Sequence, residues 1–192
     1  MMKHLLASDY KKMRWKNGLG YTLELARSAG DDLAHFEWRI SMADVSASGA
    51  FSNFLGMQRI LSVLEGAGLC LNIEGIVHQL NKGQSICFSG ERNVFAELLN
   101  GPIRDFNLIY NPNLWQAQHV RLAAKSAQTR HISADLIFLF NASTEPQVLQ
   151  INGKSCLLLH YESILLDRQE AVESILTISG IFKNLCIIEL RK

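Results

Sequence analysis

The stretch Phe36-Glu37-Trp38-Arg39-Ile40-Ser41-Met42 decides the fold class, because apolar and polar residues alternate along its whole length. The stretch Leu69-Cys70-Leu71-Asn72-Ile73-Glu74 repeats this pattern, with an aliphatic residue at every second position. Successive side chains of a β-strand point to opposite faces of the sheet, so an alternation with a period of two predicts strands. Both stretches are therefore expected to be strands with one apolar and one more polar face.

Short strand-like runs extend from these two stretches toward both ends of the chain, and turn residues such as Asn152-Gly153 separate them. The further runs are 21–26, 59–64, 94–99, 103–110, 136–140, 148–151, 156–161, 174–179 and 185–190. Many short strands at close spacing predict an all-β sandwich or barrel. Residues 113–128 are rich in Ala, Gln and Leu, and they are expected to form either a helix or an irregular bridge between two halves.

The composition is that of a globular chain with balanced charge. Of 192 residues, 48% are hydrophobic, which is enough for a sizeable core. The 19 Lys and Arg residues balance 18 Asp and Glu residues, which argues against nucleic acid or an anionic membrane surface as a partner. No apolar run approaches the roughly 20 residues that a membrane span needs. Residues 1–8 lack the apolar segment of a signal peptide, so we expect a cytoplasmic protein.

No linker rich in Pro, Gly or Ser divides the chain. The best candidate seam lies between residues 111 and 128. We therefore expect two intimately packed halves, residues 1–112 with most of the unusual polar residues and residues 113–192 with a plainer, aliphatic sequence.

Several predicted strands carry polar residues two positions apart, which places each pair on one face of its strand. The pairs are Thr22 with Glu24, Arg39 with Ser41, and Asp105 with Asn107, and Arg59 opens a further strand. Three such strands could wall a polar pocket inside an apolar barrel. The alternative is that these residues form internal ion pairs or face water, and periodicity alone favours that alternative.

The run Trp15-Lys16-Asn17-Gly18-Leu19-Gly20-Tyr21-Thr22 is the most unusual local segment. Gly18 and Gly20 permit a close approach of the backbone to a ligand, and a Trp beside an Asn provides an apolar wall with a hydrogen-bonding neighbour. The alternative is the entry of a hairpin with a core Trp. A dinucleotide-binding fingerprint does not fit, because position 23 is Leu and no helix is expected to follow.

Metal and nucleophilic chemistry have little support in the sequence. No two of the six histidines lie two or four positions apart, so neither a metal site nor a cofactor is expected. No Gly-x-Ser-x-Gly segment occurs either. Glu24 and Asp105 could act as an acid–base pair if both faced one cavity.

Four blocks in the first three-fifths of the chain resemble the HutD/Ves family. The blocks are Trp15–Ala26, Phe36–Val45, Gly49–Arg59 with Leu64-Glu65-Gly66, and Gly101–Asn107. They match the family patterns Trp-(Lys/Arg)-Asn-Gly-Gly-Gly-x-Thr-x-Glu, Trp-Arg-Ile-Ser-x-Ala-x-Val, Gly-x-Phe-Ser-x-Phe-x-Gly-x-x-Arg and Gly-x-x-x-Asp-x-Asn. Leu19 departs from the family glycine at its position.

This resemblance implies a metal-free, cupin-type (RmlC-like) double-stranded β-helix with two barrel halves in one chain, a bicupin, and a homodimer. It implies a role in histidine utilisation or stress response through a small carboxylate such as formylglutamate or urocanate, without an established enzymatic activity. It also favours the pocket over the water-facing alternative. The ligand-binding residues that we then expect are Trp15, Asn17, Gly18, Gly20, Thr22, Glu24, Arg39, Ser41, Phe51, Ser52, Arg59, Asp105 and Asn107.

Within this set we expect Arg39 or Arg59 to receive the ligand carboxylate, because a guanidinium group matches its geometry. Three functions compete. The first is a non-catalytic metabolite-binding protein, the second is a metal-independent isomerase or hydrolase of a small acid that uses Glu24 and Asp105, and the third is a partner-binding protein whose barrel is filled.

Overall fold

The structure is a computed structural model that describes residues 1–15, 20–30, 35–168 and 175–192. The regular elements of these residues are strands, apart from one short 3-10 helix, η1 (Ala7–Asp9), which confirms the all-β prediction. Among the described residues, no helix is long and apolar enough to cross a membrane.

The chain divides into two compact units. Residues Tyr10–Leu114 form the N-terminal unit, and residues Met1–Asp9 together with Trp115–Lys192 form the C-terminal unit. The first nine residues therefore belong with the second half of the chain, whereas the predicted halves had placed them in the first half, residues 1–112.

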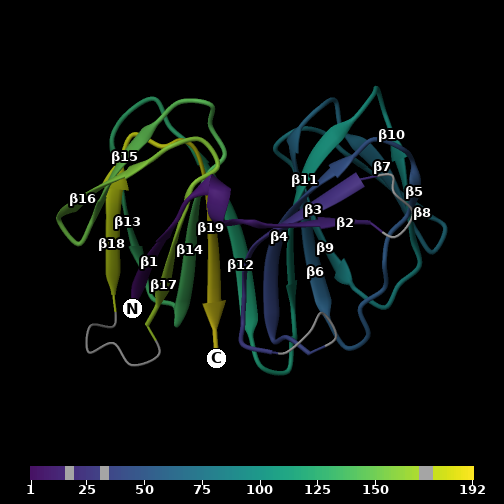
Figure 1. The fold of residues 1–192 in the computed structure, drawn as a ribbon, viewed down its shortest axis with the longest axis horizontal. Helices are drawn as coiled ribbons and strands as arrows, with labels where there is room; N and C mark the ends of the chain where they lie inside the picture. Colours follow the sequence, from purple (N-terminus) through teal and green to yellow (C-terminus); the bar gives the residue numbers. More distant parts are fainter. Residues whose placement is uncertain (16–19, 31–34, 169–174) are drawn as a thin grey trace. The chain divides into compact units, whose positions relative to one another are not determined.

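The N-terminal unit contains two antiparallel sheets (Figure 1). The six-stranded sheet has the order β2 (Lys11–Arg14), β3 (Gly20–Arg27), β4 (Trp38–Val45), β11 (Ile103–Tyr110), β6 (Gln58–Glu65) and β9 (Ser85–Ser89). The four-stranded sheet has the order β5 (Gly49–Ala50), β10 (Val94–Leu98), β7 (Leu69–Ile73) and β8 (Ile76–Leu80).

The C-terminal unit also contains two antiparallel sheets. The five-stranded sheet has the order β1 (Met2–Leu5), β17 (Ser163–Asp167), β14 (Leu136–Asn141), β19 (Lys183–Arg191) and β12 (Gln116–Ala123). The four-stranded sheet has the order β13 (Gln128–Ile132), β18 (Leu176–Gly180), β15 (Gln147–Ile151) and β16 (Lys154–Leu158).

The two units repeat one strand order. The series β4-β11-β6-β9 and β5-β10-β7-β8 of the N-terminal unit correspond, strand for strand in chain order, to β12-β19-β14-β17 and β13-β18-β15-β16. Additional strands distinguish the units, because β2 and β3 extend the N-terminal sheet beyond β4 and β1 extends the C-terminal sheet beyond β17. The two units therefore share a repeat of topology.

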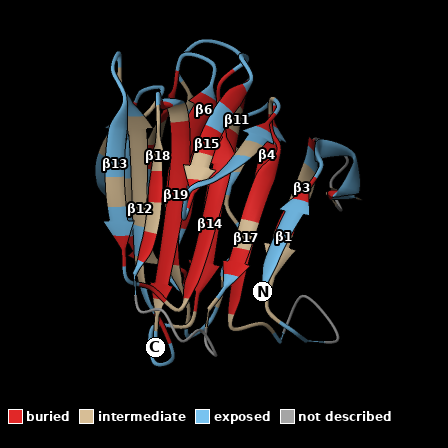
Figure 2. Ribbon diagram, turned by 90° about the vertical axis from the view of Figure 1, so that its left-hand side faces the viewer, coloured by how far each residue is buried: buried red, intermediate tan, exposed pale blue. Residues whose placement is uncertain are grey.

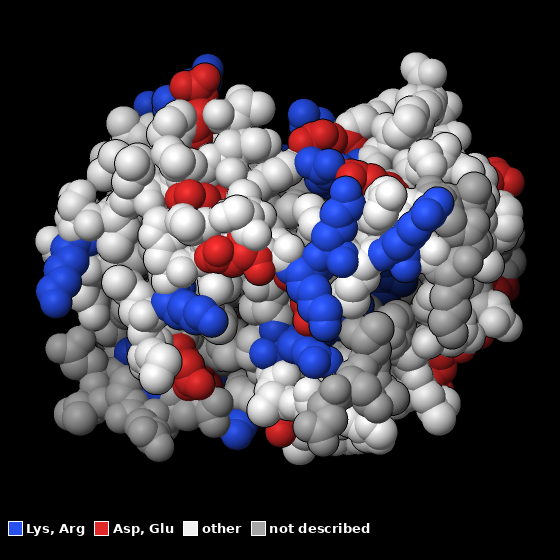
Figure 3. Space-filling view, in the orientation of Figure 1, with Lys and Arg blue, Asp and Glu red and all other residues white. Residues whose placement is uncertain are grey.

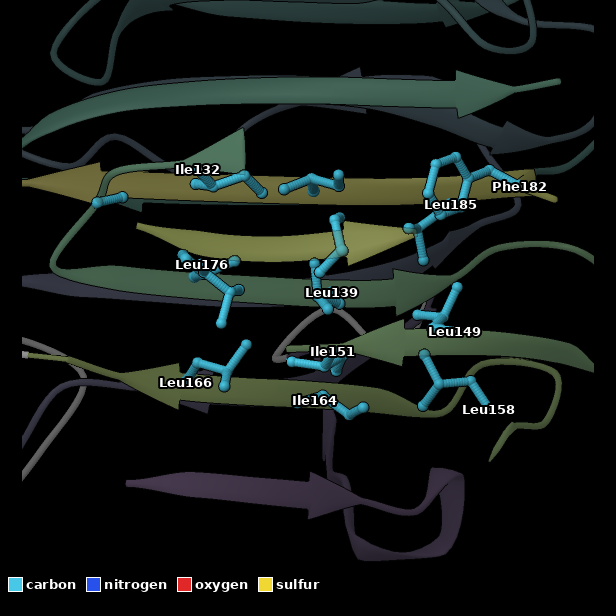
Figure 4. Close-up of a cluster of buried hydrophobic side chains, with 14 residues drawn as sticks. Ile132, Leu139, Leu149, Ile151, Leu158, Ile164, Leu166, Leu176, Phe182 and Leu185 are labelled. Carbon is cyan, nitrogen blue, oxygen red and sulfur yellow. The ribbon is translucent and has the colours of Figure 1, made fainter. Parts of the chain in front are cut away.

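Each unit has its own apolar core between its two sheets. Figure 2 shows the central strands β14 and β19 buried along most of their length. The core of the C-terminal unit is aliphatic apart from Phe182, and its side chains interlock in Figure 4. The core of the N-terminal unit is smaller and includes Leu61, Val63, Leu71 and Phe88. Both units place charged side chains on the same inward face as their core. In the C-terminal unit these are Glu189 of β19, which pairs with the core residue Ile137, and Arg130 of β13, which pairs with the core residue Ile178.

The prediction for residues 113–128 was wrong, because this segment contains strand β12 instead of a helix or an irregular bridge. Strand β12 pairs with β19 from Gln116 to Ala123, so its backbone groups are satisfied by the sheet. Seven further strands were not predicted from the sequence, namely β1, β2, β5, β8, β9, β13 and β17. Strand β8 includes His78.

Candidate functional site

The polar pairs predicted from the sequence lie together on the inward face of the six-stranded sheet. Residues paired across neighbouring strands share a face, and their partners include the core residues Leu61, Val63 and Phe88. The register arranges them in three rows, which we call the polar rows. The first row holds Thr22, Ala43, Asp105 and Val63, the second Glu24, Ser41, Asn107 and Leu61, and the third Arg27, Arg39, Ile109, Arg59 and Phe88.

Arg59 is a buried cation whose hydrogen bonds go to a neutral amide. Its side chain donates through Nε and Nη2 to Oδ1 of Asn107, with an Nε–Oδ1 distance of 2.8 Å. Its guanidinium carbon lies 4.3 Å from the ring centre of Phe51 and 5.8 Å from that of Phe88. No carboxylate of the described residues lies within ion-pair distance of this guanidinium. Burial lowers the pKa of Arg59 to about 10, so the residue stays charged at neutral pH.

Asp105 is the most deeply buried carboxyl group of the polar rows, with 1% of its surface exposed. Its Oδ1 accepts hydrogen bonds from the backbone N–H of Ala43 at 3.1 Å and from Nδ2 of Asn107 at 2.6 Å. Burial raises the pKa of Asp105 from 3.8 to about 6, although Arg59 and the two hydrogen bonds act in the opposite direction. Asp105 therefore titrates close to neutral pH.

Glu24 and Arg39 form a direct ion pair beside this group. The Nε atom of Arg39 donates to Oε2 of Glu24 at 2.7 Å, and both side chains are less than a tenth exposed. Arg27 approaches the other carboxylate oxygen, Oε1, at 3.4 Å. Arg39 is thus already neutralised by a carboxylate, which makes Arg59 the better of the two predicted anion receptors.

Arg27 was missed by the sequence analysis because a β-bulge changes the alternation of β3. The register between β3 and β4 shifts between Glu24 and Ala26, so Leu25 is the additional residue. After the bulge, Arg27 pairs with Arg39 and shares the face of Glu24, although the two residues are three positions apart. Simple alternation from Glu24 would have placed Arg27 on the opposite face.

Trp15 and Gly20 stand at one end of the polar rows. The indole Nε1 of Trp15 donates to Oγ1 of Thr22 at 2.9 Å, and its ring packs against the core of the N-terminal unit. A Cβ atom on Gly20 would lie 2.6 Å from the carbonyl oxygen of Asp44 and 2.9 Å from Cζ3 of Trp15. Glycine at position 20 therefore allows the Trp15 ring to approach the backbone of β3.

The remaining predicted residues have different positions. Ser41 lies buried in the second polar row, and Phe51 contacts Arg59. Ser52 follows Phe51 and is exposed. Asn17 and Gly18 lie outside the described residues. The structure thus brings together ten of the thirteen predicted site residues, and it adds Arg27, Phe88 and the backbone N–H of Ala43.

Two surface hollows lie away from the polar rows. One, of about 480 Å³, is lined by residues of the C-terminal unit that include His4, Cys156 and Glu162. The other, of about 220 Å³, is lined in the N-terminal unit by residues that include Asp44, Glu65 and Arg104. Neither hollow is lined by Glu24, Arg39, Arg59, Asp105 or Asn107 of the polar rows. Among the described residues, no group of three or more His, Cys, Asp or Glu side chains is arranged to hold a metal ion.

The surface charge agrees with the balanced composition. Figure 3 shows both basic and acidic side chains on the visible face, so this face is not uniformly of one charge. The distinctive electrostatic feature is therefore inside the N-terminal unit. There, three arginines and two carboxyl groups share one inward face.

These features define a cupin-type all-β protein with two topologically related units, of which the N-terminal one holds the polar rows. The HutD family model matches residues 7–181, and the chain belongs to the HutD family. It is 40% identical over 188 residues to an uncharacterized 21.2 kDa protein of the hutC 3′ region of Pseudomonas putida, covering 97% of this chain and 95% of that protein. It is 33% identical to protein Ves of Escherichia fergusonii over 69% of this chain and 71% of Ves.

Solved structures agree with this assignment. The conserved protein PA5104 of Pseudomonas aeruginosa PAO1, of unknown function, matches with a TM-score of 0.92 and 36% identity over the full length of both chains. HutD of Pseudomonas fluorescens SBW25, solved in a formate condition, matches with a TM-score of 0.85 and 35% identity over 100% of this chain and 98% of that one. YhhW of Escherichia coli shares the fold at 11% identity, with a TM-score of 0.68.

Proposed function

We propose that the protein binds a small carboxylate inside its N-terminal unit, without catalysing its conversion. The observation that carries the proposal is the Arg59 guanidinium, which is buried, charged and without a carboxylate partner among the described residues. A buried charge is costly unless an opposite charge compensates it, so this guanidinium is suited to receive an anion from outside. The planar donor fork of arginine matches a carboxylate group.

The surroundings of Arg59 support this role. Asn107 fixes one edge of the guanidinium by accepting from Nε and Nη2, which leaves Nη1 for a ligand. The guanidinium carbon lies over the rings of Phe51 and Phe88, which supply apolar walls. Ser41 lies beside Asn107 in the second polar row and can hydrogen-bond a ligand there. In this arrangement Asn107 is mainly a support for Arg59, whereas the sequence analysis had assigned it to the ligand.

The histidine-utilisation pathway supplies the candidate ligands. The resemblance to the HutD/Ves family and the hutC-region relative favour a metabolite of that pathway such as formylglutamate or urocanate. We also propose a cytoplasmic location and a homodimer, on the same family resemblance. A cytoplasmic protein would meet these metabolites where they are formed.

The test is a thermal-shift titration of the chelator-treated protein with formylglutamate and urocanate. We expect a saturable rise in Tm with one of them, because a ligand that binds only the folded state stabilises it; at 100 times Kd the gain is about 2.7 kcal/mol. The substitution Arg59→Met should abolish the rise. Arg92→Met is the matched control, since Arg92 is half exposed and pairs loosely with Glu74 at 3.8 Å. A rise that persists in Arg59→Met, or no rise with either compound at millimolar concentration, would refute the proposal.

One observation favours a second candidate, a metal-independent enzyme. The pKa of Asp105 lies at about 6, where a carboxyl group can both accept and donate protons at neutral pH. Glu24 is a weaker partner in that chemistry, because Arg39 and Arg27 hold its carboxylate. Conversion of the bound compound, followed by NMR and lost in Asp105→Asn, would establish the enzyme. Binding without conversion would leave the first proposal standing.

A further inference from the structure

We propose that an anion binding at Arg59 is accompanied by the uptake of one proton, which Asp105 receives. The inference rests on the proposed function, because it assumes an anion at Arg59. It adds a regulatory property, namely that occupancy of the site depends on pH through a group of the protein.

The geometry links the two residues through one amide. Asn107 accepts from Arg59 with its Oδ1 and donates from its Nδ2 to Oδ1 of Asp105. In the absence of a ligand, the charges of Arg59 and Asp105 therefore balance each other across the amide. An anion at Arg59 adds a second negative charge to this buried unit, where a low dielectric strengthens the repulsion.

Protonation of Asp105 restores the balance. The unit then holds one cation at Arg59, one anion on the ligand and one neutral carboxyl group, so its net charge is the same before and after binding. The proton comes from the solvent and forms an O–H bond on Asp105. Because Oδ1 already accepts two hydrogen bonds, the proton resides on Oδ2. Burial, which brings the pKa of Asp105 to about 6 before any ligand binds, makes this uptake possible at neutral pH.

The other ionisable groups around Asp105 are less suited to take the proton. On β3 and β4, Glu24 is ion-paired with Arg39 and Arg27. Asp44, also on β4, pairs with Arg104 at 2.6 Å and is half exposed. From the facing four-stranded sheet, His78 of the edge strand β8 pairs with the core residue Leu71 and so shares the inward face. His78 is therefore the competing acceptor that the experiment has to separate from Asp105. On the remaining strands, β6 contributes Arg59, and the inward residues of β9, β7 and β10 are apolar.

The experiment is isothermal titration calorimetry of the full chain with formylglutamate near pH 7, in bis-Tris, imidazole and Tris. These buffers are not anions, so they do not compete for Arg59. The slope of the observed enthalpy against the buffer ionisation enthalpy gives the number of protons taken up. Carboxyl groups of the probe titrate near pH 4 and stay ionised throughout.

We expect a measurable uptake, approaching one proton, in the wild type and in His78→Asn, and none in Asp105→Asn. The affinity of the wild type should fall by up to tenfold per pH unit between pH 6 and pH 8, whereas that of Asp105→Asn should stay constant. Binding without proton uptake in the wild type would overturn the inference and leave the proposed function intact. An uptake lost in His78→Asn would overturn the assignment to Asp105, even if Asp105→Asn failed to fold. No binding at any pH would instead refute the proposed function.

Discussion

Asp105 makes the stability of the N-terminal unit depend on pH, whether or not a ligand is present. Its pKa in the folded protein is about 6, above the ordinary value of 3.8. A carboxyl group with a raised folded-state pKa binds its proton more tightly when folded. Its contribution to stability is therefore fully present below about pH 4 and is lost as the pH rises through about 6.

The substitution Asp105→Asn tests this dependence. From pH 5 to pH 7, the wild type should lose about 1 kcal/mol of unfolding free energy relative to Asp105→Asn, since asparagine does not ionise. Urea unfolding of both proteins at the two pH values gives the difference, and the contributions of all other groups cancel in it. Equal changes in both proteins would contradict the raised pKa.

At the residue level, the sequence identified which polar residues share the inward face but not which of them contact one another. Polar pairs two positions apart identified the inward residues of β3, β4 and β11, because alternation within one strand is visible in the chain. The cross-strand register, which joins Asn107 to Arg59 and Asp105, is set by pairing between distant segments and is not visible there. The sequence alone therefore left Arg39 and Arg59 equivalent. In the structure Arg39 is paired with Glu24, whereas Arg59 has no carboxylate partner among the described residues.

Strand β3 depends on a glycine at its first position. An alanine at position 20 would bring a Cβ atom within 2.6 Å of the backbone oxygen of Asp44, a distance that requires the backbone or Trp15 to move. We expect Gly20→Ala to cost about 2 kcal/mol of unfolding free energy, in the range of overpacked positions, and to shift the Trp fluorescence. Gly49→Ala in β5 is the control, because a Cβ atom there meets nothing within 4 Å. Similar stabilities of the two variants in urea would show that Trp15 does not pack on Gly20.

Among the elements, long strands with regular alternation were predictable and short or irregular ones were not. The limits of β11 agree with the predicted run, residues 103–110. Strand β12 was missed because its burial pattern is mixed, and its Ala and Gln residues favour a helix in isolation. Its pairing with β19 overrides that local preference. The bulge at Leu25 left no sequence signal, since no glycine or proline marks it.

For the whole molecule, the structure predicts one ligand per chain. The inward faces of β14 and β19 carry Ile137, Leu139, Leu185 and Ile187, which are fully buried. The buried carboxylate of the C-terminal unit, Glu189, is paired with Arg130 and Arg191. Calorimetric titration with formylglutamate should therefore give a stoichiometry of one. Two ligands per chain would place a second site outside the polar rows.

The repeated strand order has a consequence for how substitutions accumulate in this chain over evolutionary time. Both units keep the same topology, although one encloses three rows with charged residues and the other a mainly aliphatic core beside the ion pairs of Glu189. The topology alone therefore does not require the charged rows, and inward positions of the C-terminal unit are free to exchange one aliphatic residue for another as long as volume is conserved. The inward positions of Glu24, Arg39, Arg59, Asp105 and Asn107 lack that freedom, because an exchange at any of them breaks a specific hydrogen bond or ion pair. Substitutions are therefore expected to be tolerated more often at the aliphatic inward positions of the C-terminal unit than at these five positions of the N-terminal unit.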